Sequence, residues 1–291
     1  MKKFILLFVM IPALSFSQGE EADILLNGTV SAENNQIKNV EDPTDDQDAV
    51  TLVFLLEKLS YLQDQIDALQ SSGNITDQDG NTYNIMPYCD QVWTVQNAQM
   101  STYRDGTPIP EVSDNTEWAN LTTGAWQYTF HGPTPEKLYN WYAVMGIHDT
   151  DPNTPNKEFA PLGWHVPSDA EWTTFENCLI ASGYNYDGTT TEDKIAKAIA
   201  STSGWVEDQD SPGAPGYNQS TNNSSGFNIY PFGTIDDNGP VNGASNSVLW
   251  SSTEETSDTA NRRFLHWGTE YFSNNTAANK RDGFSVRLVK D

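Results

Sequence analysis

Tryptophan is distributed very unevenly along this chain of 291 residues, and its distribution divides the chain into two parts. All nine Trp residues lie from Trp93 onward, whereas residues 18–80 hold 14 acidic side chains, two basic ones and no Trp. Large aromatic side chains dominate protein cores, and a charged segment without them buries little apolar surface. The sequence therefore predicts a thin acidic N-terminal segment followed by a globular domain with an aromatic core.

The first 17 residues have the layout of a secretory signal peptide. Lys2 and Lys3 precede an apolar run over residues 4–14, and Ser15 and Ser17 form a small-x-small cleavage site. Such a peptide is removed from the mature protein, and no later segment reaches the ~18 apolar residues of a membrane span. We expect a secreted or bacterial cell-surface protein without a transmembrane span, the alternative being an amphipathic N-terminal helix of the mature fold.

The formal net charge of −25 excludes one class of partner. Binding of DNA or RNA through the phosphate backbone needs a Lys/Arg surface that releases counterions. This chain would repel a polyanion, so we expect no nucleic-acid partner.

Residues 18–44 are predicted to form an extended acidic stalk, and residues 45–72 a helix. Thr44 and Gln47 fit a capping box after Pro43. An apolar strip follows at spacings of three and four, the a/d pattern of a coiled coil. We name it the leucine strip: Leu52, Leu55, Leu59, Leu62, Ile66 and Leu69. The strip predicts self-association, the alternative being a single helix packed on the globular domain.

The segment before the helix carries a resemblance of its own. Residues 39–43, NVEDP, and 47–51, QDAVT, are similar to a short repeat that precedes trimeric coiled coils in phage tail fibres and related bacterial surface fibres. The resemblance implies a parallel homotrimer, a strand number that the heptad spacing alone does not specify.

The globular domain, residues 75–291, is predicted to hold two helices, several short strands and a long loop. Ser168 and Glu171 fit a capping box, with Trp172, Phe175 and Leu179 at helical spacing. A second helix is expected over residues 192–200, and strands over 82–85, 92–96, 248–251, 263–267 and 284–289. Residues 211–247 hold seven Asn, six Gly and four Pro, which predicts a long irregular and functional loop or, alternatively, a tolerated insertion. Segregated helices and strands indicate an α+β fold.

Several motifs of this domain occur in the order found in one family. They are residues 79–83 (DGNTY), 91–97 (QVWTVQN), 138–144 (LYNWYAV), 163–172 (GWHVPSDAEW), 225–227 (SGF), 249–254 (LWSSTE) and 284–291 (FSVRLVKD). This order resembles the Fibrobacter succinogenes major paralogous domain, a secreted or surface module of Bacteroidetes and Fibrobacteres. The resemblance implies a C-type-lectin-like fold related to the sulfatase-modifying-factor group. The enzymes of that group need a pair of nearby cysteines late in the chain, which Cys89 and Cys178 do not match.

No other catalytic or metal-binding motif is present. None of the four His residues lies at a metal-ligand spacing, and we interpret His165 as a packed structural residue. Two segments offer oxygen ligands for calcium, namely residues 77–81 and Asp236, Asp237 and Asn238. Both are also typical of plain turns. Cys89 and Cys178 form either a disulfide or two small buried hydrophobes. We expect no cofactor, with calcium as the one candidate.

The expected function is non-enzymatic recognition of a glycan or a protein, with several heads adding avidity. A candidate binding surface combines flat aromatic faces with hydrogen-bond donors near the C-terminus. Its residues are Trp250, Arg262, Arg263, His266, Trp267 and Tyr271, although Trp250 fits the core equally well. The alternatives are a structural envelope or fibre component without a soluble ligand and a cryptic enzyme of the sulfatase-modifying-factor type.

Overall fold

A computed structural model describes residues 55–56, 58–60, 73–272 and 277–291 of the chain. The chain divides into two units, residues 1–65 and 66–291, and the globular part of the second is described below. The predicted signal peptide, residues 18–44 and Leu52, Leu62, Ile66 and Leu69 of the leucine strip lie outside the described residues. Leu55 and Leu59 are helical and about half exposed, at 47% and 52%.

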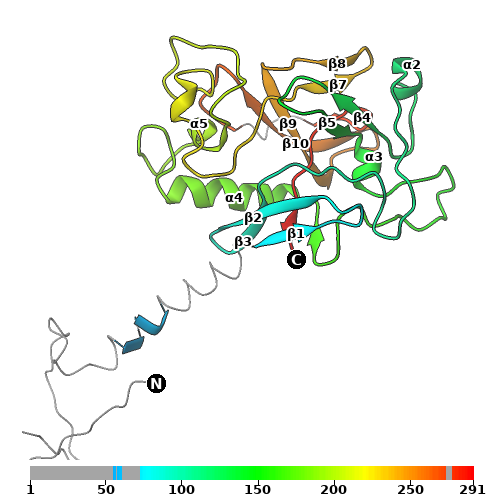
Figure 1. The fold of residues 1–291 in the computed structure, drawn as a ribbon, viewed down its shortest axis with the longest axis horizontal. Coiled ribbons are helices and arrows are strands. Elements are labelled where there is room, and N and C mark those ends of the chain that lie inside the picture. Colours follow the sequence, from blue (N-terminus) through cyan, green and yellow to red (C-terminus); the bar gives the residue numbers. More distant parts are fainter. Residues whose placement is uncertain (1–54, 57, 61–72, 273–276) are drawn as a thin grey trace, which may run out of the picture. The chain divides into compact units, whose positions relative to one another are not determined.

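The globular unit is built mainly from antiparallel sheets (Figure 1). The largest has five strands in the order β1-β2-β3-β12-β6, a second has the order β11-β10-β9, and β4-β5 and β7-β8 form separate pairs. The first sheet contains β1 (Asn74–Thr76), β2 (Thr82–Tyr88), β3 (Gln91–Thr94), β6 (Trp164–His165) and β12 (Val289–Lys290). The other strands are β4 (Trp126–Thr129), β5 (Glu136–Tyr139), β7 (Thr234–Asp236), β8 (Gly239–Val241), β9 (Asn246–Glu254), β10 (Thr259–His266) and β11 (Ala278–Asn279).

Helices are few and short in the described part of the chain. In the globular unit only α4 (Asp169–Ala181) exceeds four residues, and its other helices are α2 (Asn115–Trp118), α3 (Trp141–Val144), α5 (Ala196–Ile199) and the 3-10 turn η1 (Gln219–Thr221). The predicted α+β, C-type-lectin-like class is therefore wrong, because antiparallel sheets and irregular segments make up most of the unit. No coiled-coil stalk is evident among the residues that the structure describes.

Helix α4 confirms the prediction from its capping box. The Ser168 hydroxyl accepts the Glu171 N–H, and the Glu171 carboxylate accepts the Ser168 N–H at 2.8 Å. The second predicted helix, residues 192–200, shrinks to the single turn of α5. Glu192 has a φ of +63°, and Ala200 is extended and bridges to Ile229, so the backbone leaves the helix at both ends.

Aromatic side chains form much of the core, and most of them belong to two large hydrophobic clusters. In one, Trp93, Trp172, Phe175 and Phe227 pack with ring centroids 4.5–6.1 Å apart, which is the range of favourable aromatic pairs. In the other, the Trp250 and Phe284 rings lie 4.3 Å apart. The sequence-based expectation of an aromatic core is borne out by these clusters.

The C-terminal residues 284–289 were predicted to form one strand, yet only Val289 and Lys290 belong to a named strand. The preceding residues instead make isolated bridges, with Phe284 beside Tyr139 and Ser285 beside Leu249. Figure 1 shows the C-terminus at the same end of the unit as β1–β3, as the pairing of Val289 with Trp93 requires.

A disulfide joins Cys89, between β2 and β3, to Cys178 on α4, with a Cα–Cα distance of 6.1 Å. The bond closes a loop across 89 residues of sequence and fixes α4 against the first sheet. The sequence left open whether Cys89 and Cys178 form a disulfide or two small buried hydrophobes, and the structure contains the disulfide.

We predict that removing this disulfide lowers the free energy of unfolding by about 4 kcal/mol, because a long closed loop restricts the unfolded chain. Urea unfolding of the mature protein with and without reductant measures the difference, and Cys89→Ser combined with Cys178→Ser should reproduce it. Two free thiols in the oxidised, purified protein, detected by thiol titration under denaturing conditions, would contradict the pairing.

Candidate functional site

Residues 211–247, the predicted functional loop, contribute to two separate hollows in the surface. The segment is not wholly irregular, since it contains η1 and the β7-β8 hairpin. Its first half borders a cleft of about 570 Å³ beside the end of α4, and its second half borders a groove of about 340 Å³ beside β5.

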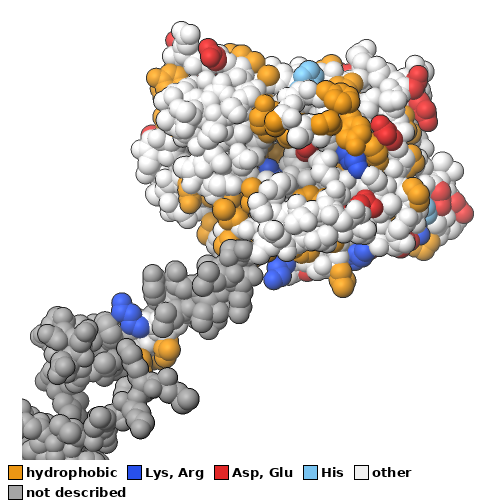
Figure 2. Space-filling model, viewed as in Figure 1, with side chains coloured by type: hydrophobic (Ala, Val, Ile, Leu, Met, Phe, Trp, Pro, Cys, Tyr) orange, Lys and Arg blue, Asp and Glu red, His pale blue; other side chains and the backbone are white. Residues whose placement is uncertain are grey.

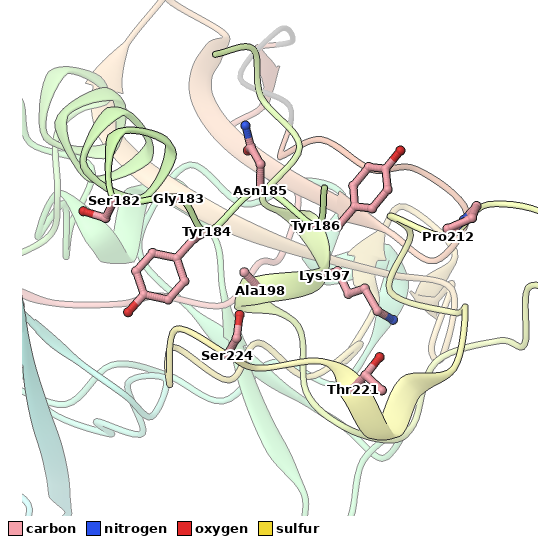
Figure 3. A pocket seen from close by; sticks show the side chains of 10 residues that line it. All are labelled: Ser182, Gly183, Tyr184, Asn185, Tyr186, Lys197, Ala198, Pro212, Thr221 and Ser224. Carbon is pink, nitrogen blue, oxygen red and sulfur yellow. The ribbon is translucent and has the colours of Figure 1, made fainter. Parts of the chain in front are cut away.

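We name the first hollow the tyrosine cleft, after Tyr184 and Tyr186. Figure 3 shows the two rings at opposite ends of the cleft and the Lys197 side chain pointing toward Thr221. The lining is polar but uncharged except for Lys197. The full lining is Ser182, Gly183, Tyr184, Asn185, Tyr186, Lys197, Ala198, Pro212, Thr221 and Ser224.

The position of Tyr186 is fixed by its neighbours. A Cβ atom on Gly213 would lie 2.3 Å from the Tyr186 ring, so the ring packs directly on that glycine. The nearby Glu270 carboxylate, which also accepts a hydrogen bond from the hydroxyl, raises the pKa of Tyr186 and keeps the phenol neutral. The ring is nevertheless 41% exposed, which leaves a face open to a ligand.

Two polar side chains, the buried Asn185 and the half-buried Lys197, hold the walls of the tyrosine cleft. The Asn185 amide donates to the carbonyls of Thr191 and Glu192, which fixes the loop after α4. The Lys197 ammonium donates to the Tyr217 carbonyl and, at 2.8 Å, to the Asn222 side chain, which fixes the opposite wall. Burial lowers the pKa of Lys197. The cleft is therefore preformed by contacts within the protein.

We name the second hollow the proline groove. Its apolar lining includes Pro133, Pro135, Tyr230 and Phe232, and the Tyr230 and Phe232 rings lie 4.9 Å apart. Hydrophobic side chains gather on this face of the molecule, over β4 and β5 (Figure 2). The floor is polar, with Asn97, Glu136 and Arg287 buried beneath the opening.

Comparison with known proteins places the chain in a family. A family model described as the Fibrobacter succinogenes major domain matches residues 86–290. The chain belongs to the Fibrobacter succinogenes major domain family. No curated protein and no solved structure matches it. Among the described residues of this family member, no helix is long and apolar enough to cross a membrane.

The six residues of the sequence-predicted binding surface line neither hollow of this Fibrobacter succinogenes major domain. Trp250 and Arg263 are fully buried and so cannot touch a soluble ligand in this conformation. The Trp250 indole donates to the Tyr139 carbonyl at 2.7 Å, and Arg263 pairs with Glu176 at 2.5 Å and with Asp169. Burial raises the pKa of Glu176 to about 7, an effect that Arg263 opposes.

The remaining four predicted residues are partly or well exposed. Arg262 lies over the Phe264 and Phe284 rings, and His266 stacks on Phe264 with centroids 5.9 Å apart. Burial lowers the pKa of His266. Trp267 contacts His266, and Tyr271 is 47% exposed. Their role in ligand binding stays a prediction.

The candidate calcium residues form the turn of the β7-β8 hairpin. The Asp236 carboxylate accepts the Asn238 N–H at 2.7 Å, an Asx turn that ends at Gly239 with a φ of +100°. In the part of the chain that the structure describes, no three His, Cys, Asp or Glu residues are grouped so as to hold a metal ion. The other candidate carboxylates are used in hydrogen bonds within the protein. Asp77 accepts one from the Tyr83 hydroxyl, and Asp79 accepts one from the Thr102 hydroxyl. Calcium dependence stays a prediction.

His165 joins two carboxylates on different segments. Its Nδ1 lies 2.7 Å from Asp291 and its Nε2 lies 2.7 Å from Glu171. Burial disfavours the charged ring, but the hydrogen bonds to the two carboxylates outweigh burial and raise the pKa of His165. These contacts tie the C-terminus to the start of α4, which agrees with a structural role.

Sequence reasoning missed the residues of both hollows. Tyr184 and Tyr186 lie one and three residues after Gly183 in the loop that follows α4, and Glu136 is the first residue of β5. The one usable signal was the composition of residues 211–247, which supply a wall to each hollow.

Proposed function

We propose that this protein is an exported, non-enzymatic recognition protein, secreted or displayed on a bacterial cell surface, that binds a glycan in the tyrosine cleft. The observation that carries the proposal is the pair of tyrosine rings at opposite ends of one preformed cleft (Figure 3). Aromatic faces stack on sugar rings, and small polar side chains between them hydrogen-bond to hydroxyl groups. Two platforms suit an oligosaccharide of more than one ring.

The chemistry of the lining favours binding over catalysis. Among the described residues that line the cleft there is no carboxylate, histidine or thiol, and its titratable groups are two tyrosines and one lysine. The lysine amine is held by Tyr217 and Asn222, where it shapes the wall. Export agrees with the signal-peptide layout and with the Cys89–Cys178 disulfide, since disulfides persist in oxidising compartments.

We predict that residues 18–291 bind glycans on an array and that Tyr184→Ala and Tyr186→Ala each weaken the binding about tenfold, or roughly 1.4 kcal/mol, through loss of a stacking face. Titration calorimetry with the best glycan measures the change. Tyr271→Ala is the matched control, because it removes an exposed tyrosine outside the cleft.

Two outcomes would contradict the proposal. Loss of binding in Tyr271→Ala with full binding in both cleft variants would place recognition on the C-terminal surface that the sequence indicates. Absence of binding by the wild-type chain to glycans and to host cells would favour a structural envelope or fibre component.

We also propose that mature chains associate as a homotrimer through the leucine strip. The spacing of the strip and the tail-fibre resemblance of residues 39–51 support this proposal, as do the exposed Leu55 and Leu59 side chains, which a second chain would cover.

For residues 18–291 we predict a trimer mass in sedimentation equilibrium at micromolar concentration, and a monomer mass for Leu55→Asp combined with Leu59→Asp, because charges at an apolar interface oppose association. Leu162→Asp is the control, since Leu162 is 85% exposed on the globular unit. A monomeric wild-type chain would contradict association.

A further inference from the structure

The floor of the proline groove contains a buried carboxylate, Glu136, that has no ion-pair partner among the described residues. Glu136 is only 6% exposed, and Asn97 donates to its Oε1 at 2.6 Å. No described Lys, Arg or His nitrogen lies within the 4.0 Å of an ion pair with it. Buried carboxylates are normally paired with a cation, because an isolated buried charge is costly. Glu136 lacks that cation and borders an open groove.

Arg287 is the nearest buried cation, but its hydrogen bonds go elsewhere. Its Nε donates to the Asn97 side chain at 2.5 Å, and its two terminal nitrogens donate to the carbonyls of Thr94, Phe227 and Asn228. Its guanidinium also lies 4.6 Å from the centre of the Phe227 ring. The Arg287 charge is thus stabilised by carbonyls and a π face, and Asn97 stands between it and Glu136.

The aromatic side chains that line the groove are held in place by close packing. A Cβ atom on Gly132 would lie 2.2 Å from the Phe232 ring, and one on Gly204 would lie 2.3 Å from the Tyr230 ring, so each ring packs on a glycine. The Phe232 carbonyl accepts the Thr129 hydroxyl at 3.1 Å. Pro133 and Pro135 also line the groove, so a group that enters it meets aromatic and proline surfaces as well as the carboxylate.

This arrangement matches one kind of ligand. A long aliphatic stem buries well between apolar walls, aromatic faces attract a cation, and a desolvated carboxylate forms a strong charge-assisted hydrogen bond with an ammonium. From Asn81 onward the chain has 26 acidic and 11 basic side chains, a net charge of −15 that steers cations toward it.

We propose that the proline groove binds an alkylammonium group, with Glu136 as its counter-ion and Tyr230 as its aromatic wall. A lysine side chain of a protein partner carries all of this chemistry. A choline headgroup carries the positive charge and fits the aromatic wall, but its quaternary nitrogen donates no hydrogen bond to Glu136. The site is separate from the tyrosine cleft and does not depend on glycan binding there.

The state of Glu136 gives the site a distinctive pH dependence. Burial raises the pKa of Glu136 to about 7, although the Asn97 hydrogen bond and Arg287 oppose the shift. Arg287 is the charged group that faces it from another segment, and Tyr139 on the same strand stays neutral because burial raises its pKa. A bound ammonium favours the ionised carboxylate, so binding near pH 7 should release about half a proton per ligand and weaken as the pH falls.

The test uses calorimetric titration of residues 18–291 with Nα-acetyl-lysine-methylamide, with choline, and with Nα-acetyl-norleucine-methylamide as the uncharged match of lysine. Repeating each titration in two buffers with different ionisation enthalpies measures the proton release. We expect the lysine amide or choline to bind at least tenfold more tightly than the norleucine amide. The tighter of the two identifies the source of the ammonium.

Glu136→Gln removes the charge and keeps an oxygen that accepts the Asn97 N–H, so the fold should be retained, as circular dichroism checks. We expect this variant to bind the charged and uncharged probes equally and to release no proton, and Tyr230→Leu to lose several-fold affinity. Tyr186→Ala in the tyrosine cleft should bind like wild type. Equal wild-type affinity for the norleucine amide, no ammonium binding at millimolar concentration, or full binding by Glu136→Gln would each overturn the proposal.

Discussion

The C-terminal segment, residues 284–291, is the element on which the rest of the globular unit depends. Phe284 exchanges two backbone hydrogen bonds with Tyr139, and Ser285 accepts from Trp250 and donates to Val248. Farther along, the Val286 carbonyl accepts from Ala98 and the Leu288 carbonyl from Thr94. Because one short segment bonds to β3, β5 and β9, it joins sheets that share few other backbone contacts. Phe284, Val286, Leu288 and Val289 are also fully buried, each worth about 1.5–3 kcal/mol of apolar burial.

The same segment links the fold to the surface that we assign to recognition. Arg287 leaves it beneath the proline groove, where its hydrogen bonds fix Asn97 and the carbonyls of residues 227 and 228. Residues 227 and 228 belong to the segment 211–247, which borders both hollows. A scaffold closed by its own C-terminus can thus carry a long segment of Asn, Gly and Pro that would have no fixed shape alone. Preformed walls lower the ordering cost of binding, which suits the recognition role that we propose.

The sequence predicted what is decided locally. The capping box of Ser168 and Glu171 and the apolar spacing after it specify α4 within a few residues, and the aromatic core follows from the placement of Trp. The fold class was not predictable in this way, because short strands and isolated bridges pair residues more than 100 positions apart, as Tyr139 and Phe284 do. For the same reason the role of Glu136 was not predictable from the sequence. Its surroundings are formed by Asn97 and Arg287, which lie 39 and 151 positions away in the chain. Residue type alone was misleading for Trp250 and Arg263. Both side chains are typical of binding surfaces, but here they are buried in the core.

Residues 284–289 lock the sheets together, and through Arg287 they fix the floor of the proline groove. Amide hydrogen exchange of the mature protein under native conditions, resolved by residue, measures this most directly. We expect the amides of Phe284, Ser285 and Leu288, with their partners Thr94, Tyr139 and Trp250, to exchange in the slowest class, at the rate of global unfolding. Exchange of residues 284–288 well before the amides of β9 and α4 would show that the C-terminal segment opens independently, and would contradict the account.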